Sequence, residues 1–201
     1  MPIITISLII ITVGISFLAW NKPAVYEQFL MNPYKVKRRL ELHRFITSGF
    51  IHADYGHLFF NMFSLFLFGK IIEENLSPLF YISLYLLAII VSEIPTYLKN
   101  HINAYYNSLG ASGGVAAVVF SAILLDPIKM EICIFFGLCV TAFIYGFLFL
   151  LYSYIQGKRG GDNINHDAHF YGALFGVIFT IIVYPEVLYR FLNELQDWGM
   201  F

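Results

Sequence analysis

Long apolar stretches separated by short polar segments run through the chain as far as about residue 184. The hydrocarbon core of a bilayer is about 30 Å thick, and a helix needs roughly 20 apolar residues to cross it. Several of the stretches approach or reach that length. The pattern predicts an all-α membrane protein with six transmembrane helices in one domain, residues 1–201, and a long first loop. The predicted spans are about 2–20, 57–72, 79–98, 109–125, 131–155 and 167–184.

The first span shares its hydrophobicity with a secretory signal but lacks the other features of one. A signal peptide has a positively charged start and small residues before its cleavage site. Here no basic residue precedes Ile3, and the stretch ends in Phe17-Leu18-Ala19-Trp20. We therefore expect a retained helix with its tryptophan at the membrane interface, where indole rings collect.

Composition agrees with the membrane assignment. Apolar residues make up 59% of the chain and charged residues 12%, and 201 residues leave no room for a second soluble domain. A net charge of −1 without a long basic run argues against nucleic acid as a partner. Cys133 and Cys139 both fall in the fifth predicted span. On a helix, residues six apart point to different faces, so we expect no disulfide between them.

Two connections between the spans stand out. Residues 21–56 mix aromatic and basic side chains, which fits a partly helical segment lying in the membrane interface as well as an ordinary soluble loop. Residues 156–166 are rich in Gly and Asn, so we expect this connection to be mobile.

Chain parity gathers four polar residues at one membrane face. Six spans put both termini on one side, so every even-numbered helix starts on the other side. Ser112 is early in the fourth span, His169 is early in the sixth, and His57 and Asn61 are early in the second. All four are therefore expected near one another, with Ser112 roughly 5–10 Å below the headgroups.

These residue types match the parts of a hydrolytic site. A serine and a histidine at one depth are the minimum for a nucleophile and a general base. The free N–H groups of a helix start would stabilise an oxyanion on Ser112, and His57 and Asn61 share a helical face from which both can donate hydrogen bonds. Small residues would let the fourth and sixth helices approach closely: Gly110, Gly113, Gly114, Gly172 and Gly176.

Each residue also has an ordinary structural interpretation. A membrane serine usually bonds back to a carbonyl one turn earlier, and a stripe of small residues usually means packing only. Intramembrane histidines are rarer, because polar groups are costly there and tend to be functional. The joint placement of the four residues favours function.

Two acids receive no catalytic role. Asp167 stands two residues before His169 and points away from it on a helix, where a first-turn acid suits the helix dipole. The predicted site is therefore a Ser–His dyad. Glu93 lies inside the third span beside Pro95. It is expected to bond backbone groups that the proline frees or to line a water path, and the structural role is favoured.

Three motifs resemble those of the rhomboid intramembrane serine proteases. That family has HxxxN at the second span, GxSG at the fourth and AHxxGxxxG at the sixth. This chain matches them in order with His57 to Asn61, with Gly110-Ala111-Ser112-Gly113, and with Ala168-His169 followed by Gly172 and Gly176. The resemblance covers nearly the whole chain and implies a rhomboid-like bundle.

The resemblance implies a serine endopeptidase that needs no cofactor or metal and cleaves transmembrane protein substrates within the lipid bilayer. Ser112 would be the nucleophile, His169 the general base, and His57, Asn61 and the Ser112 N–H the oxyanion hole of an acyl-enzyme mechanism. The first loop would embed in the outer leaflet, and residues 156–166 would cap the site. Substrate would enter beside the fifth helix and be cut after a small residue.

The chain departs from the family at two points. The first loop has His43-Arg44 where the family often has Trp-Arg, and this concerns how the loop is anchored. An aromatic residue commonly lies four residues after the serine and stacks on the histidine, but this chain has Ala116 there. Tyr171 or Phe120 is expected to support His169 instead, or its ring is held more loosely.

Charge and resemblance disagree about orientation. Nine Lys and Arg side chains lie on the predicted site face and three on the other, which by the positive-inside rule puts the site in the cytoplasm. The best-studied bacterial members of the family that this chain resembles open outward. We expect a multi-pass protein of the bacterial cell membrane with an outward site and cytoplasmic termini, because lipid headgroups can hold a basic interfacial loop.

Three alternatives stay open. Gly110 to Gly114 also fits the GxSxG elbow of lipases, but the flanking sequence lacks the strand that this motif needs. A histidine-box metalloenzyme could use His52 and His57 together with His166 and His169, although six histidines are too few for two irons and HExxH is absent. A non-enzymatic transporter or scaffold would not need a serine and a histidine at matched depth.

Overall fold

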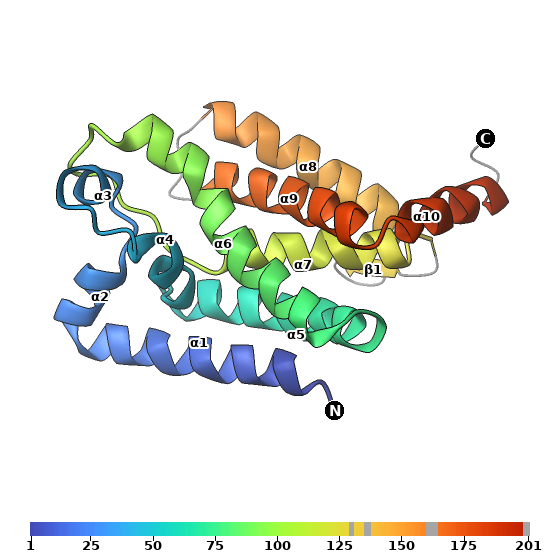
Figure 1. The fold of residues 1–201 in the computed structure, drawn as a ribbon, viewed down its shortest axis with the longest axis horizontal. Helices are drawn as coiled ribbons and strands as arrows, with labels where there is room; N and C mark the ends of the chain where they lie inside the picture. The colour runs from blue at the N-terminus through green and yellow to red at the C-terminus, as the bar shows by residue number, and fades with distance from the viewer. Residues whose placement is uncertain (129–130, 135–137, 160–164, 199–201) are drawn as a thin grey trace.

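The computed structural model describes residues 1–128, 131–134, 138–159 and 165–198. Most of this part of the chain is helical. Six of its helices lie side by side along the long axis of the molecule, and shorter elements lie at the two ends (Figure 1). The six are α1 (Ile3–Asn21), α5 (Tyr55–Asn75), α6 (Pro78–Asn100), α7 (Ser112–Leu125), α8 (Ala142–Arg159) and α9 (His166–Val183).

Four of these helices, α1, α5, α6 and α9, are long and apolar enough to cross a membrane. The apolar helices Ser112–Leu125 and Ala142–Gln156 are shorter. At 1.5 Å per residue the 14 residues of α7 reach about 21 Å, which is less than the thickness of the hydrocarbon core. The count of six spans therefore stays a prediction.

α7 forms the centre of the bundle. The sequence placed its start near residue 109, but the helix begins at Ser112, and every residue after Ser112 is buried. It packs against α5, α6 and α9. Its glycines and alanines make this possible, because small side chains let neighbouring helix backbones come close in a membrane protein.

Side-chain caps fix where α5 and α9 begin. The Asp54 carboxylate accepts a hydrogen bond from the His57 N–H at 2.8 Å, and the Asn165 side-chain oxygen accepts one from the Ala168 N–H at 3.1 Å. Each cap satisfies an N–H group that has no carbonyl one turn earlier. The caps therefore place His57 and His169 in the first turns of their helices.

The first loop folds into short helices at one end of the bundle (Figure 1). They are α2 (Pro23–Phe29), α3 (Pro33–Arg39), α4 (Arg44–Thr47) and the 3-10 helix η1 (Ser48–Phe50). The partly helical character expected from the sequence is present.

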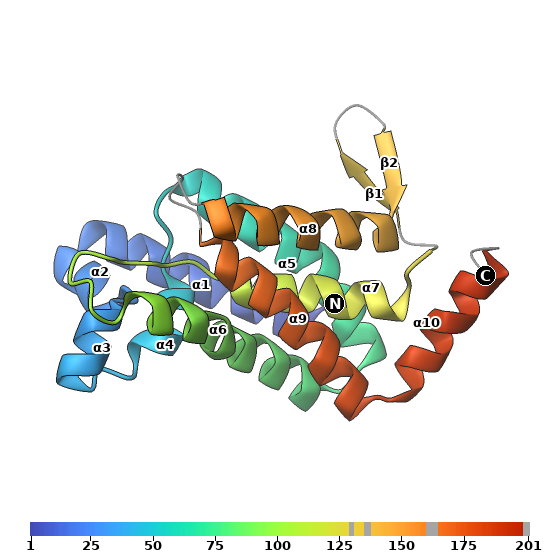
Figure 2. The ribbon, with the colours of Figure 1, turned by 90° about the horizontal axis from the view of Figure 1, so that it is seen from above.

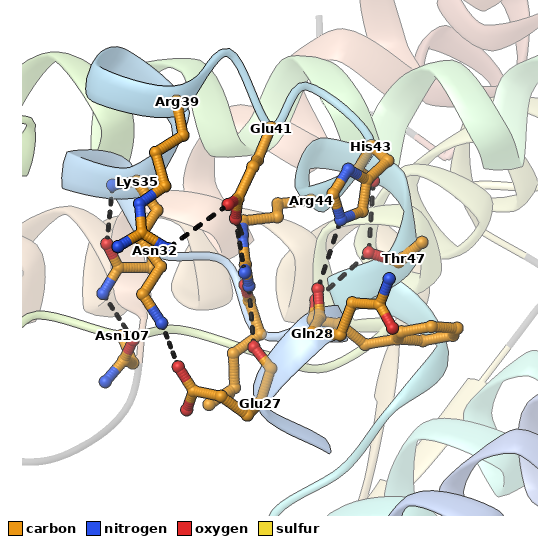
Figure 3. A network of polar contacts seen from close by, with 12 residues as sticks. Glu27, Gln28, Asn32, Lys35, Arg39, Glu41, His43, Arg44, Thr47 and Asn107 are labelled. Atoms are coloured by element: carbon orange, nitrogen blue, oxygen red, sulfur yellow. Dashed lines mark hydrogen bonds and ion pairs between the residues drawn. The ribbon is translucent and has the colours of Figure 1, made fainter. Parts of the chain in front are cut away.

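Arg44 anchors this loop from within (Figure 3). Its side chain is buried, with 4% of the residue exposed. One guanidinium nitrogen donates to the carbonyls of Glu27 and Leu30 at 2.8 and 2.6 Å, and Nε donates to the Glu41 carboxylate at 2.6 Å. The hydrogen bond from Arg44 holds the pKa of Glu41 below its usual value. The histidine that replaces the family's tryptophan leaves this anchor in place.

The fifth predicted span is wrong over its first part. Residues Glu131–Ile134 and Leu138–Thr141 form the antiparallel strands β1 and β2, and α8 starts only at Ala142. Cys133 lies directly opposite Cys139, and the two form a disulfide, contrary to expectation. The expectation assumed a helix, on which these residues diverge, whereas directly opposed residues of paired strands are neighbours. The fold is mostly helical rather than all-α.

A helix that hydropathy did not predict follows α9. This helix, α10 (Glu186–Asp197), lies at the end of the molecule that holds both termini and turns away from the bundle axis (Figures 1 and 2). Val187 and Leu195 are buried, whereas Tyr189 and Leu192 are exposed. Its mixture of apolar and charged residues is too polar for a hydropathy window to detect.

An acid joins α1 to α5 at this same end. The Glu73 carboxylate accepts hydrogen bonds from the N–H groups of Ile4 and Thr5 at 2.8 and 2.9 Å, and from the Thr5 hydroxyl at 2.9 Å. These N–H groups open α1 and have no carbonyl one turn earlier, so the carboxylate satisfies them. Glu73 is a structural residue at the opposite end of the bundle from Ser112.

Candidate active site

The helices α5, α7 and α9 all begin at the end of the bundle that carries the first loop (Figure 1). Ser112 is the first residue of α7, His57 and His169 lie in the first turns of α5 and α9, and Asn61 lies one turn further along α5. All four line a single cavity of about 1220 Å³. The structure brings together the residues that chain parity placed at one face.

The cavity is polar near the helix starts and apolar along the helices. Its polar lining includes Asp54, Asn100, Asn107, Ser108, Asn165 and Asp167. Most of its apolar lining comes from α5, α7 and α8 and includes Phe60, Val115, Ala116, Val119, Phe120, Tyr145 and Phe149. The apolar side chains that α5 and α8 contribute form an apolar flank of the same cavity that Ser112 lines.

The first loop holds the segment that leads into Ser112. The backbone of Ser108 pairs with that of Met31 through two hydrogen bonds of 3.0 Å, and the Gly110 N–H donates to the Ser48 carbonyl at 2.9 Å. The backbone before Ser112 is thus fixed by residues outside the six long helices.

Gly110 is required by its backbone and by its neighbour. Its φ is +115°, a conformation that other residues rarely adopt. A Cβ at this position would also lie 2.6 Å from Cε1 of His57. The glycine therefore lets the His57 ring sit directly against the segment before Ser112.

His52 provides a further anchor, and its partners fix its tautomer. Its Nε2 accepts a hydrogen bond from the Ala111 N–H at 3.3 Å, so the proton is on Nδ1, which lies 3.0 Å from Ser16 Oγ. The Ser16 hydroxyl donates to the Phe50 carbonyl at 3.1 Å and can accept from Nδ1. The residue is fully buried, and this burial, followed by the nearby His57, lowers the pKa of His52 to about 3.

The start of α7 can stabilise negative charge. The first of its N–H groups with a carbonyl one turn earlier is that of Val115, which donates to Ala111 at 2.9 Å. The N–H groups of Ser112 and Gly113 come before it, at the positive end of the helix dipole. An oxyanion formed at Ser112 would lie beside these donors.

α7 and α9 touch backbone to backbone close to the site. A Cβ on Gly172 would lie 2.3 Å from the Gly113 carbonyl oxygen, and one on Gly176 would lie 2.5 Å from that of Ala117. Side chains at these positions would force the helices apart. The contact holds the first turn of α9, which carries His169, against the start of α7.

The aromatic support of His169 comes from α8. The Phe149 ring stacks on the imidazole with centroids 6.0 Å apart and planes 28° from parallel, and the His166 ring contacts it edge-on at 5.8 Å. Phe149 fills this role rather than Tyr171 or Phe120, the residues expected from the sequence. The small side chain of Ala116 lies in the same cavity wall.

The predicted oxyanion-hole residues have partners of their own. The Asn61 amide donates one hydrogen bond to the His57 carbonyl at 2.9 Å, and a side-chain amide nitrogen has a second hydrogen to donate. The His57 ring contacts His52 edge-on, with centroids 5.0 Å apart. Both residues line the cavity beside Ser112.

Asp167 pairs with another helix. Its carboxylate accepts a hydrogen bond from Lys99 Nζ at 2.5 Å, at the end of α6. This ion pair gives the acid a structural partner, and the absence of a catalytic role for Asp167 stays a prediction.

Glu93 has other partners than expected. Its carboxylate accepts hydrogen bonds from the Ser108 hydroxyl at 3.0 Å and from the Asn165 amide at 3.3 Å, rather than from backbone freed by Pro95. The sequence interpretation gave no role to Ser108, Asn165 or Phe149. None of them belongs to a spaced motif, and the one available signal was an asparagine just before a predicted helix, where caps are common.

A comparison with known families agrees with the three motifs. A family model described as "Rhomboid domain" matches residues 39–186, which is most of the chain and includes every candidate site residue. The chain belongs to the rhomboid family. It is therefore a multi-pass membrane protein of a family whose characterised members include proteases.

Three curated relatives illustrate the family's range. This rhomboid is 29% identical to RHOMBOID-like protein 12, mitochondrial, of Arabidopsis thaliana, over 87% of this chain and 56% of the relative. It is 30% identical to Rhomboid-like protein 11, chloroplastic, of the same plant, over 68% and 50% of the two chains. It is 26% identical to Rhomboid protease GlpG of Haemophilus influenzae, over 71% and 70%.

The two plant relatives are longer than this chain and belong to organelles. This rhomboid spans about half the length of the two plant relatives. Because those two proteins belong to a mitochondrion and a chloroplast, the relatives do not support the expected bacterial cell membrane over an organelle membrane.

Proposed function

We propose that this rhomboid is an intramembrane serine endopeptidase that hydrolyses peptide bonds in or near transmembrane segments of other membrane proteins. The observation that carries the proposal is the placement of Ser112 and His169. Both line one cavity, at the starts of two helices whose backbones touch. A nucleophile and a base held in this way favour acyl transfer.

The reaction proceeds in two stages. Ser112 Oγ attacks the carbonyl carbon of the scissile bond while His169 takes its proton. His169 then gives that proton to the leaving amine as the C–N bond breaks, which leaves an acyl-enzyme. Water attacks the ester, its proton passes through His169 back to Ser112, and the carboxylic acid leaves.

The oxyanion hole consists of the Ser112 N–H with the side chains of His57 and Asn61. Each of these donors belongs to a residue on the cavity wall. Loss of one such donor typically costs about 100- to 1000-fold in rate. Asn61 can donate to the oxyanion because only one of its two amide hydrogens is used in the hydrogen bond to the His57 carbonyl.

The substrate is a transmembrane segment that reaches Ser112 along the apolar flank between α5 and α8, and it is cut after a small residue. Aromatic side chains on both of these helices face this part of the cavity. Water reaches the acyl-enzyme from the polar side. The predicted cap, residues 156–166, includes residues 160–164, which lie outside the described part of the chain.

Two variants test the proposal. Ser112→Ala and His169→Ala should each lower kcat for a model transmembrane substrate by at least about 10,000-fold while expression is kept. Asp167→Ala is the matched control beside the histidine. It should stay within about fivefold of the parent, because a partly exposed ion pair contributes at most about 1 kcal/mol.

A serine-directed fluorophosphonate gives an independent readout. It should label the parent and Asp167→Ala but not Ser112→Ala. Equal labelling of the parent and Ser112→Ala would overturn the assignment of the nucleophile.

The other function classes give different results in the same assays. A histidine-box metalloenzyme would lose activity to metal chelators, whereas the serine protease should not. A transporter or scaffold would keep its function when both Ser112 and His169 are replaced. The rings of His52 and His57 touch, as do those of His166 and His169, but within the described residues no group of three metal-ligating side chains forms.

An outward-facing site with cytoplasmic termini stays a prediction, and two features of the chain oppose it. The first is the excess of Lys and Arg on the site face. The second is the disulfide between Cys133 of β1 and Cys139 of β2, since disulfides persist in oxidising compartments and β1 lies toward the end of the bundle that holds the termini (Figure 1). A topology reporter fused to the C-terminus decides between the two orientations.

A further inference from the structure

Glu93 is hydrogen-bonded both to the segment before α7 and to the residue that caps α9. It is an acid inside α6, a predicted membrane span, with 5% of the residue exposed. Ionisable residues in such places are costly and tend to be retained for function. Glu93 itself does not line the cavity, but its partners Ser108 and Asn165 do.

We propose that Glu93 is a positioning residue that sets the nucleophile and the base relative to each other by holding Ser108 and Asn165 on one carboxylate. The inference rests on the proposed protease function. It assigns Glu93 no contact with substrate.

On the nucleophile side, the link runs through the segment before α7. The Ser108 hydroxyl lies 3.2 and 3.0 Å from the two carboxylate oxygens and donates to them. The Ser108 backbone is paired with Met31, so the residue is held from both sides. Ser112 follows only four residues later, at the first turn of α7.

On the base side, the link runs through the cap of α9. The Asn165 amide nitrogen donates to Glu93 at 3.3 Å and to the Thr96 hydroxyl at 3.0 Å. The side-chain oxygen of Asn165 caps α9 by accepting a hydrogen bond from the Ala168 N–H, and the backbone carbonyl of Asn165 accepts one from the His169 N–H at 3.3 Å. The carboxylate is therefore two hydrogen bonds away from the backbone of the general base.

A carboxylate suits this position because it accepts several hydrogen bonds at once through two oxygens. An alanine would leave the Ser108 hydroxyl and one amide hydrogen of Asn165 without this acceptor and would open a space between α6 and the two segments. A glutamine would keep one carbonyl oxygen as an acceptor, and its amide could donate to the Ser108 hydroxyl oxygen.

The test compares kcat and KM for a model transmembrane substrate. Glu93→Ala should lower kcat about 10- to 100-fold, because displacements near 1 Å at a reacting pair have effects of this size, and KM should change less than about twofold. Glu93→Gln should recover most of the lost rate. Ser108→Ala, which keeps the backbone pair with Met31, should also lower kcat.

Glu73→Ala provides the matched control. Glu73 also accepts three hydrogen bonds inside the bundle, but it does so at the far end. Both Ala variants should lower the midpoint of thermal unfolding, and only Glu93→Ala should lower kcat at a temperature where both are folded. A double variant of Glu93→Ala with Ser108→Ala should lose no more rate than Glu93→Ala alone, since both remove one shared contact.

The outcomes separate the two proposals. The positioning role would be overturned if Glu93→Ala and Ser108→Ala had the same kcat as the parent protein, or if Glu73→Ala lost as much kcat as Glu93→Ala. Either result would leave the proposed protease function intact. A parent protein that neither cleaves substrate nor reacts with fluorophosphonate would overturn both. If Glu93→Ala does not fold, Glu93→Gln and Ser108→Ala carry the comparison.

Discussion

Gly172 packs against the backbone of Gly113, next to the proposed nucleophile Ser112. In Gly172→Ala the new Cβ would lie 2.3 Å from the Gly113 carbonyl oxygen, 2.8 Å from its Cα and 2.9 Å from its carbonyl carbon. All three contacts are with backbone, so no side-chain rotation can relieve them. The helices α7 and α9 must move apart.

The size of the movement follows from the contact distance. Non-bonded heavy atoms are comfortable at about 3.5 Å or more, so α9 must retreat by roughly 1 Å at this level. The retreat occurs one turn from His169 and beside Ser112. A displacement of that size costs about 100-fold in rate, and overpacking costs about 1–3 kcal/mol in stability.

The assay is cleavage of a model transmembrane substrate by purified protein in detergent, with the thermal midpoint measured on the same samples. Gly14→Ala in α1 is the matched control, because a Cβ there has no atom within 4 Å. It should leave kcat unchanged and keep or raise the midpoint, since alanine favours a helix over glycine by about 1 kcal/mol. A kcat for Gly172→Ala equal to that of Gly14→Ala would refute the reasoning.

Three further predictions follow from contacts at the site and in the first loop. The free energy of unfolding should fall by up to about 1.4 kcal/mol per pH unit as the pH drops from 6.5 toward 3. The reason is that His52 takes up a proton in the unfolded state, whereas burial keeps the pKa of His52 near 3 in the folded state. Thermal midpoints measured across this pH range should fall less steeply in His52→Gln than in the parent. Arg44→Ala should cost about 3 kcal/mol by leaving buried carbonyls without a donor, and Arg44→Lys should not restore the thermal midpoint, because an ammonium cannot reach all the acceptors of a guanidinium. Phe149→Ala should lower kcat by up to about tenfold through loss of the ring that stacks on His169, whereas Phe149→Tyr should stay near the parent in the same cleavage assay.

Much of the bundle was predictable because hydropathy has a strong physical cause. The bilayer excludes charge over long stretches, so α1, α5, α6 and α9 stand out in the sequence. The same reasoning failed in the fifth span. Apolar residues from 131 to 141 suit a short strand as well as a helix, and periodicity alone does not separate the two. The disulfide expectation failed with it.

The site could be predicted as far as parity and spacing reach. Ser112, His169, His57 and Asn61 were brought together by the alternation of helix directions, which needs no knowledge of side-chain contacts. The supporting residues could not be found in this way. His52, Ser108, Asn165 and Phe149 act through single contacts between segments far apart in the chain, and no local pattern records such contacts.

The sequence by itself determined the membrane character, the direction of the helices and the end of the bundle at which Ser112 and His169 line one cavity, because each depends on local hydrophobicity and on the order of the spans. Tertiary structure alone decided how near those two helices stand, which ring supports the imidazole and which buried acid joins the segments behind them. These features depend on packing between distant residues, where differences of about 1 Å and single hydrogen bonds select one arrangement.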